Sequence, residues 1–323
     1  MRKQAALTSI LALAAFTAQA DATLSFSAGV ENGLTQQYAY LDSSALPPTL
    51  NSGLQHIATS DGSATLQAWA NPNTGAFKSI VTASVGSGLP TSTAYGYASF
   101  NLSDTLRFSG PGDTVQVSFT LSHDSVLSGM DQQQFSAYQL IDHLVRAGSN
   151  RSLSLNYTIA NPSFDPNATC IDYGSDGMYC PPETQQTLNI NENANSDVSG
   201  QVEYQRNGQT GARQVVRFGL GDGHYTATDT YVFTLPTNVD ISLGYRAWTT
   251  AECYHMANCT ITSDASHSDY LGLNIIGAGS FASSSQYQYL GLAAAVPEPS
   301  SAVLAFGGLV GLLAWRRRQG KSA

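Results

Sequence analysis

The chain has 323 residues and a mass of 34.1 kDa, enough for one large domain or two small ones. Only 11% of its residues are charged, against roughly 25% in an average soluble domain. With 42% hydrophobic residues, this composition excludes a charge-rich disordered chain and a polytopic membrane protein. A formal charge of −9 argues against a nucleic-acid partner, whose phosphates need a basic surface.

The N-terminus has the three parts of a secretory signal peptide. Arg2 and Lys3 give a positive start, and residues 7–16 form an apolar run that is too short to span a membrane. Ala18 and Ala20 form the small-x-small pattern of a cleavage site. These features predict an exported protein whose leader ends at Ala20.

In the body of the chain, apolar and polar residues alternate with period two. The clearest runs are residues 24–30, 115–121, 153–159 and 239–245. Such runs predict strands with one buried and one solvated face, which is typical of antiparallel sheets.

Turn signals separate these runs. An Asn-Pro-Asn-Thr-Gly segment at 71–75 divides two strand-like runs, and a Gly- and Pro-containing segment at 109–113 precedes the run from 114. We therefore expect an all-β fold, an antiparallel two-sheet β-sandwich of jelly-roll type.

One segment departs from this pattern, because its apolar residues recur at helical spacing: Phe135, Tyr138, Ile141, Leu144 and Val145. Gly148 stands where a helix C-cap is expected. A strand through the same residues would place Gln139 and His143 on its apolar side. We expect a helix over residues 131–148, with a strand as the alternative.

Four cysteines lie in two local pairs. Cys170 and Cys180 close one short loop, and Cys253 and Cys259 close another, so in an oxidising compartment two disulfides are expected. A metal site that uses Cys253, His255 and Cys259 is the alternative, but it lacks a fourth ligand at a standard zinc spacing.

Three ordered features close the chain: the segment Pro297, Glu298 and Pro299; the charge-free apolar stretch 302–315; and the cluster Arg316, Arg317 and Arg318. A helix of 14 residues is only ~21 Å long, so flanking residues and snorkelling arginines would have to complete a span of ~30 Å. The arginines favour the cytoplasmic side, which places the preceding chain outside.

This order of features resembles the PEP-CTERM sorting signal of exported proteins in Gram-negative bacteria. In that family an exosortase, a membrane-embedded thiol protease and transpeptidase, recognises the Pro-Glu-Pro segment and removes the tail. The resemblance implies recognition at 297–299, a stop at 316–318 and a transient inner-membrane anchor. The mature protein would then lie at the cell envelope, the outer surface or in the extracellular matrix. An ordinary single-pass anchor is the alternative, and it predicts the same topology.

The chain then divides into a signal peptide (1–20), a β-sandwich body (21–295) and a sorting signal (296–323). The body keeps 8 basic and 22 acidic residues, a formal charge of −14. Nucleic acid and anionic membrane surfaces are therefore unfavourable partners of the body. A neutral glycan, a divalent cation or no ligand remains.

No catalytic, cofactor-binding or metal-binding residue is predicted. The sequence lacks His-Glu-x-x-His, Gly-x-Ser-x-Gly and Walker patterns. Oxygen-bearing residues at 191–197 alternate as in a calcium loop, but the turn glycine is missing and Val202 replaces the acidic twelfth residue. A solvated polar loop is the alternative to a calcium site there.

We expect an exported structural or matrix-associated protein without enzymatic activity, because the resemblance implies a role in exopolysaccharide or biofilm. Carbohydrate binding is the second hypothesis, since tyrosine combines a flat apolar ring with a hydroxyl group. A secreted polysaccharide-degrading enzyme is the third. The expected partners are an exosortase and exopolysaccharide.

Overall fold

The computed structural model describes a series of segments in the body: residues 21–31, 36–44, 50–86, 92–131, 143–206, 213–267, 270–285, 287 and 289. The predicted leader, with Ala18 and Ala20, and the predicted sorting helix lie outside these residues. Within the described segments, no helix is long and apolar enough to cross a membrane.

The larger of two antiparallel sheets, sheet A, has the strand order β12-β11-β8-β14-β6-β1-β2, and β17 pairs with β6. Its strands are β1 Asp21–Glu31, β2 Gln36–Ser44, β6 Thr93–Ser109, β8 His143–Ala160, β11 Thr187–Arg206, β12 Arg213–Gly219, β14 Asp240–Tyr254 and β17 Ser280–Ser283.

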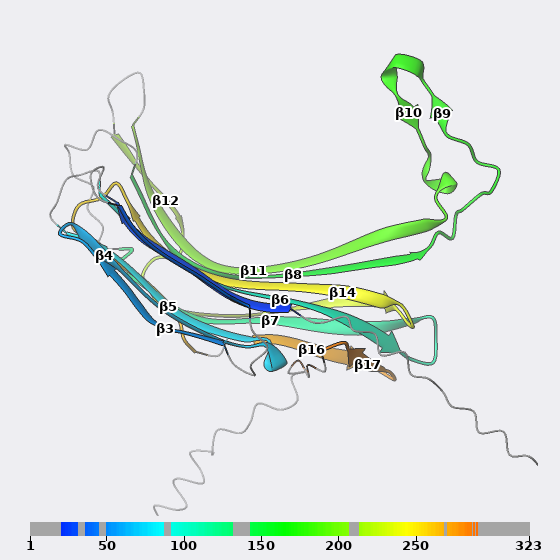
Figure 1. Ribbon diagram of the computed structural model, residues 1–323, viewed down its shortest axis with the longest axis horizontal. Helices are drawn as coiled ribbons and strands as arrows, with labels where there is room; N and C mark the ends of the chain where they lie inside the picture. The colour runs from blue at the N-terminus through cyan, green and yellow to red at the C-terminus, as the bar shows by residue number, and fades with distance from the viewer. Residues whose placement is uncertain are drawn as a thin grey trace, which may run out of the picture.

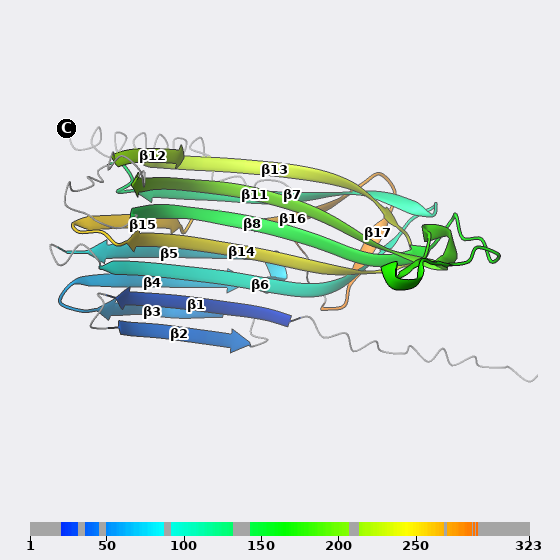
Figure 2. The ribbon, with the colours of Figure 1, turned by 90° about the horizontal axis from the view of Figure 1, so that it is seen from above.

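Sheet B has the order β13-β7-β15-β5-β4-β3, and β16 pairs with β7. Its strands are β3 Leu50–Ala58, β4 Gly62–Asn71, β5 Ala76–Val85, β7 Thr114–Ser128, β13 Gly223–Pro236, β15 Cys259–Ala265 and β16 Tyr270–Ile276. The two sheets lie face to face, and both curve along their strands (Figures 1 and 2). The predicted two-sheet antiparallel sandwich is confirmed.

The core lies between the sheets, where the apolar parity of each strand meets that of the other sheet. Phe77 of β5 stacks on Phe100 of β6 with ring centroids 6.2 Å apart, and Phe100 meets Tyr245 of β14 edge-on at 6.2 Å. All three side chains are buried. The four predicted period-two runs fall in β1, β7, β8 and β14, apart from Val239, which directly precedes β14, and most of their apolar residues are buried in this core.

Both predicted turns are also confirmed. Between β4 and β5, the Asn71 side chain accepts a hydrogen bond from the Asn73 backbone N–H, and a 3-10 turn spans Pro72–Thr74. Gly75 then takes a φ of 63°, a left-handed conformation that glycine adopts without steric cost. At the second turn, β6 ends at Ser109 and β7 begins at Thr114.

The helix expected over 131–148 is wrong for its final residues, which begin β8. His143, Val145 and Ala147 are buried, while Arg146 points to solvent, as a strand requires. β8 pairs with β11 on one side and β14 on the other, so two ladders of backbone hydrogen bonds override the helical spacing. Residues 132–142 lie outside the described chain.

Between β8 and β11 the chain makes an excursion, residues 161–186, which we call the arm. It contains the short pair β9 Ile171–Asp172 and β10 Met178–Tyr179, with 3-10 turns at Gly174–Asp176 and Pro182–Thr184. Cys170 and Cys180 form a disulfide with Cα atoms 4.1 Å apart. At its base, the Asn161 amide donates to the carbonyls of Pro182 (2.9 Å) and Gln185 (2.8 Å). The arm stands on the concave side of sheet A (Figure 1).

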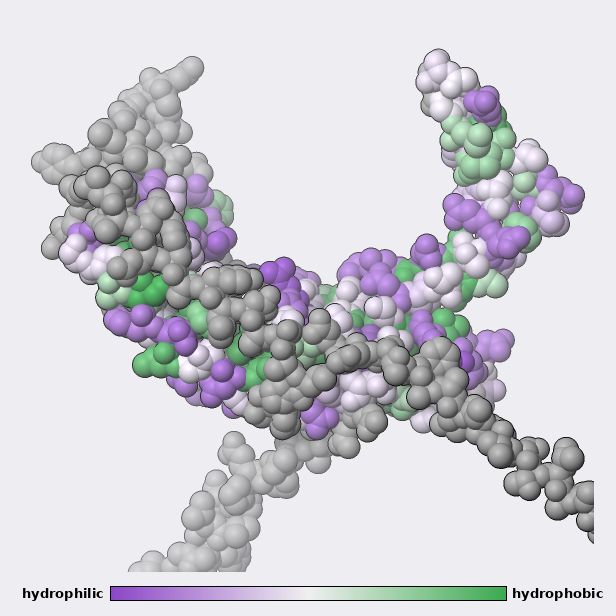
Figure 3. Space-filling view, in the orientation of Figure 1, coloured by the Kyte–Doolittle hydropathy of each residue, from purple (hydrophilic) through white to green (hydrophobic). Residues whose placement is uncertain are grey.

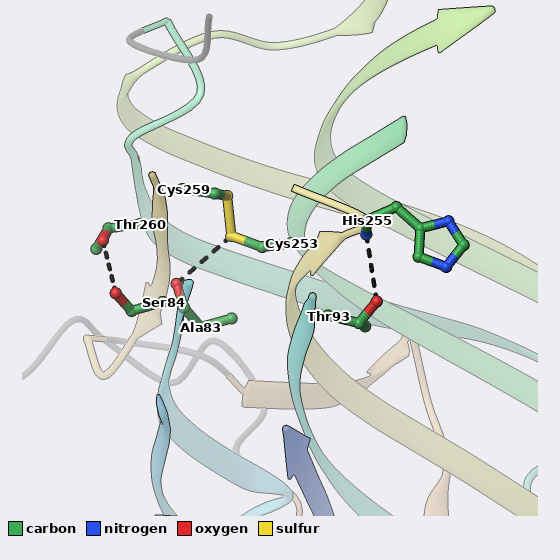
Figure 4. The surroundings of a disulfide bond; sticks show 7 residues. All are labelled: Ala83, Ser84, Thr93, Cys253, His255, Cys259 and Thr260. Carbon is green, nitrogen blue, oxygen red and sulfur yellow. Dashed lines mark hydrogen bonds between the residues drawn. A yellow bond between two sulfur atoms is a disulfide. The ribbon is translucent and has the colours of Figure 1, made fainter. Parts of the chain in front are cut away.

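The second disulfide, Cys253–Cys259, joins β14 of sheet A to β15 of sheet B, with Cα atoms 6.1 Å apart. Both cysteines are fully buried, and Cys253 Sγ lies 3.7 Å from the carbonyl of Ala83 (Figure 4). The His255 backbone N–H donates to Thr93 Oγ1 at 3.2 Å. The two layers are therefore covalently tied at this end, and the predicted pairing of Cys253 with Cys259 is the one the structure shows.

The last described residues are fixed to sheet A through one buried carboxylate. Asp104 of β6 accepts hydrogen bonds from the hydroxyls of Ser283 (2.6 Å), Ser284 (2.8 Å) and Tyr289 (2.6 Å). Tyr289 is 1% exposed, and burial is the main cause that raises the pKa of its hydroxyl. The folded body thus extends to within a few residues of the predicted sorting signal.

The two disulfides should differ in their effect on stability. The double substitution Cys253→Ala/Cys259→Ala should lower the free energy of unfolding by about 2 kcal/mol, because it releases a short loop that ties the sheets. The same change at Cys170 and Cys180 should leave the unfolding of the sandwich unchanged, because the arm strands pair with each other and not with either sheet. Denaturant unfolding of the mature protein measures both, and equal losses would contradict this division.

Candidate functional site

The outer face of sheet A lies on the inside of the curve of the sandwich and forms a concave surface (Figure 1). Alternation along the strands gives this face the polar side chains, because their apolar neighbours fill the core. The space-filling view shows a mostly hydrophilic surface between the arm and the opposite end of the molecule (Figure 3). Its residues come from β6, β8, β11 and β14, four adjacent strands.

Strand β11 carries a regular row of polar residues on this face: Asn189, Asn191, Asn193, Asn195 and Asp197. In the antiparallel register they lie opposite polar residues of β8: Thr158, Asn156, Ser154, Ser152 and Asn150. Each amide offers two donors and one carbonyl acceptor, repeated every two residues or ~6.6 Å. The two strands therefore present a ladder of hydrogen-bonding groups along the length of the face.

An aromatic cluster lies beside this ladder. The Arg246 guanidinium sits over the ring of Trp248, 5.0 Å from its centroid, and donates to the Tyr97 hydroxyl at 2.7 Å. Trp248 and Tyr97 are half-buried, so each keeps part of its surface open to solvent. The cation–π contact and the hydrogen bond hold flat apolar surfaces and polar groups in a fixed arrangement.

Charges on the face are largely compensated. Arg146 of β8 pairs with Glu252 of β14 at 3.0 Å, and Arg107 of β6 pairs with Asp240 of β14 at 3.3 Å. Asp197 accepts hydrogen bonds from the Asn150 amide (3.1 Å) and the Ser199 hydroxyl (2.6 Å). The face is therefore polar but carries little net charge, unlike the acidic body as a whole.

Three shallow hollows follow one another along the strands of this face. The first, about 280 Å³, is lined by Tyr97, Arg146, Asn150, Asp197 and Trp248. The second, about 320 Å³, is lined by Asn101, Ser152, Asn193 and Arg246. The third, about 730 Å³, lies near the base of the arm and is lined by Asn156, Thr158, Asn189, Asn191 and Asp240. Their order fits an extended ligand that runs along the strands.

A buried arginine on the core side of sheet A is hydrogen-bonded to the backbone of the strands that form the concave face. Arg151 of β8 is fully buried and donates to the backbone carbonyls of Asn150 (2.8 Å) and Trp248 (3.3 Å), two residues of the first hollow. Its guanidinium also lies 5.3 Å from the ring centroid of Phe77 in sheet B. Burial lowers the Arg151 pKa to about 10, so the group stays charged at neutral pH.

Next to Arg151, sheet B contributes a buried histidine. His123 Nδ1 lies 3.1 Å from Ser149 Oγ, and Ser149 Oγ lies 2.8 Å from Ser125 Oγ. Burial, with a smaller effect of the Arg151 charge, lowers the His123 pKa from its ordinary value of 6.5 to about 3. His123 is therefore neutral under all physiological conditions.

The segment 191–197, considered as a calcium loop or a solvated loop, is not a loop, because it lies within the strand β11. Its side chains alternate between the two faces of the sheet: Asn191, Asn193, Asn195 and Asp197 face outward, and Ala194 and Ser196 are buried. In the described segments no group of three or more His, Cys, Asp or Glu side chains could hold a metal ion. Calcium binding stays an untested hypothesis.

Sequence reasoning missed the residues that build this face. The Asn row was visible as an alternation, but it was interpreted as a loop because asparagine is uncommon in strands. Trp248 and Arg246 stand two residues apart in β14, a spacing that places both on one face once the strand is known. Their proximity to Tyr97 and Asn150 depends on strand order, for which the sequence carries no local signal.

Comparison with known protein families finds one match, the PEP-CTERM protein-sorting motif, over residues 295–318. The matched range contains Pro297, Glu298 and Pro299 and also the arginine cluster 316–318. The earlier resemblance is thereby confirmed. No curated protein and no solved structure matches the chain.

The depressed pKa of His123 predicts a pH-dependent stability. Below pH 6.5 the unfolded chain binds a proton at His123, whereas the folded chain binds this proton only below about pH 3. The free energy of unfolding should therefore decrease as the pH is lowered through this window, by up to about 1.4 kcal/mol per pH unit from this group. Denaturant unfolding at several pH values should show a shallower slope for His123→Gln than for the unmodified protein. Identical slopes would contradict the assignment.

Proposed function

We propose that this PEP-CTERM domain-containing protein, which is exported and sorted at the cell surface of a Gram-negative bacterium by an exosortase, holds neutral polysaccharide on the concave face of sheet A. The protein would act as a non-catalytic component of the extracellular matrix or biofilm. The observation that carries the proposal is the asparagine ladder of β11 beside the cluster of Trp248, Arg246 and Tyr97.

The chemistry of the face suits a sugar polymer. Hydroxyl groups of sugars both donate and accept hydrogen bonds, and amide side chains meet both needs. Trp248 and Tyr97 add flat apolar surface with a polar group at the edge. Because Arg146 and Arg107 are already paired with acids, the face offers no strong field for an anionic polymer.

The dimensions of the face favour a polysaccharide chain over a single sugar as the ligand. Along β8 the lining residues extend from Arg146 to Thr158, or ~40 Å at the usual rise of a strand. The hollows are open and shallow, which suits the side of a long polymer more than the enclosed burial of a small ligand. A polymer would therefore contact several weak subsites at once.

The sorting signal supports a matrix role for such a site. Sorting brings the body to the outside of the cell, where extracellular polysaccharide is found. A body with a net charge of −14 would not adhere to anionic membrane surfaces, so retention near the cell needs another ligand. A neutral polysaccharide on the concave face would provide that retention.

The substitution Trp248→Ala should weaken binding to neutral polysaccharide from the matrix of the producing cells by about tenfold or more. Loss of a central aromatic contact typically costs about 1.4 kcal/mol or more, which corresponds to that factor. Affinity electrophoresis of the mature protein in gels containing the polysaccharide measures the change. Trp69→Ala is the matched control, because Trp69 is also half-buried but lies in β4 of sheet B.

Equal retention of both variants would contradict the site, and absence of retention for the unmodified protein would contradict polysaccharide binding. The release of new reducing ends from the polysaccharide would show instead that the protein is an enzyme. In that case the non-catalytic role would be wrong, while the location of the site would still be decided by Trp248→Ala.

A further inference from the structure

The long strand β13 forms an open edge of the sandwich. In the described chain it pairs with β7 alone, in an unbroken register from Gly223 to Pro236. Figure 2 shows it along the outer margin of the molecule. One side of its backbone therefore presents unpaired N–H and C=O groups along its length, a template for a further strand.

This edge lacks most of the devices that usually prevent pairing between molecules. Between residues 223 and 235 there is no lysine, arginine or proline, and the register with β7 contains no bulge. The sequence is instead rich in residues that favour strands, including four threonines, and Val232 is 56% exposed. Asp229 is the one acid, and it accepts a hydrogen bond from Ser196 of β11.

The neighbouring edge of sheet A is open as well. Over residues 187–199, β11 pairs with β8 only, because β12 covers only 200–206 in the described chain. The Tyr231 hydroxyl of β13 donates to the Asn195 carbonyl of β11, so a hydrogen bond links the two sheet edges on this side of the molecule. No described strand of sheet A therefore stands in the way of a molecule that approaches β13 along most of its length.

We propose that β13 pairs with β13 of a second copy of this chain, in an antiparallel two-fold dimer that makes sheet B continuous across both molecules. A second copy fits because antiparallel pairing about a two-fold axis makes an edge complementary to itself. Such a dimer is a closed assembly, because it uses the free β13 edge of both copies and leaves none for a third molecule.

The register follows from symmetry and charge. A two-fold axis perpendicular to the sheet must pass midway between the two copies of one residue. Only Asp229 or Thr230, at the middle of β13, can be that residue if nearly the whole strand is to be paired. Centring on Asp229 would set two carboxylates directly opposite, which is unfavourable. Centring on Thr230 sets Thr230 opposite its own copy and Thr228 opposite Val232, pairs of β-branched residues that stabilise sheets.

The dimer is independent of polysaccharide binding, but the two would reinforce each other. Because the axis is perpendicular to sheet B, both copies would present their concave faces on the same side. Two weak sites joined in this way bind a polymer with higher avidity than one.

A single cysteine at the axis tests the proposal. The four native cysteines are all in disulfides, so Thr230→Cys adds the one free thiol to the described chain. Mild oxidation of the mature protein should link most of it into a covalent dimer on non-reducing gels. Val232→Cys, which faces the same way in the same strand, should stay unlinked, because its two copies would lie ~13 Å apart.

Sedimentation at physiological salt gives a second measurement. The unmodified protein should have twice the mass of one chain, and Thr228→Lys/Val232→Lys should be monomeric because lysines would lie opposite lysines. Ser118→Lys is the matched control and should stay dimeric, since Ser118 lies opposite Val232 on the same face but in the interior strand β7. A monomeric unmodified protein, or equal crosslinking at 230 and 232, would overturn the proposal.

Discussion

Each strand of sheet A must divide its side chains between two environments, and the core and the concave face both depend on this constraint. In β14, Tyr245 and Ala247 fill the space between the sheets, while Arg246 and Trp248 face outward. A one-residue shift in register would exchange the two sets and destroy both. The polar face is therefore a consequence of the same alternation that builds the core.

The interior is not uniformly apolar, and its polar part lies directly beneath the candidate site. Burying the Arg151 guanidinium is costly unless its donors are satisfied, and the backbone carbonyls of Asn150 and Trp248 satisfy two of them. Burial also raises the pKa of Tyr245 to about 12, so this neighbour stays neutral. We infer that Arg151 fixes the backbone beneath the aromatic cluster, which keeps the face rigid.

Much of the fold follows from the sequence, since alternation and turn residues are local signals, as at residues 71–75. The start of β8 was missed because Leu144 and Val145 fit a helical spacing equally well, and only pairing with β11 and β14 decides between the two. The site was missed for a different reason. Its four strands become neighbours through crossings between the sheets, and sequence separation hides that Tyr97 and Arg246 are in contact.

The central claim is that polysaccharide binds on the concave face, and tryptophan fluorescence tests it most directly. Before the sorting tail, the chain holds two tryptophans, Trp69 on sheet B and Trp248 on the concave face. Titration of the mature Trp69→Phe variant with matrix polysaccharide should give a saturable change in emission from Trp248. The mature Trp248→Phe variant should give none. A change confined to Trp69 would place the ligand on the opposite face and contradict the claim.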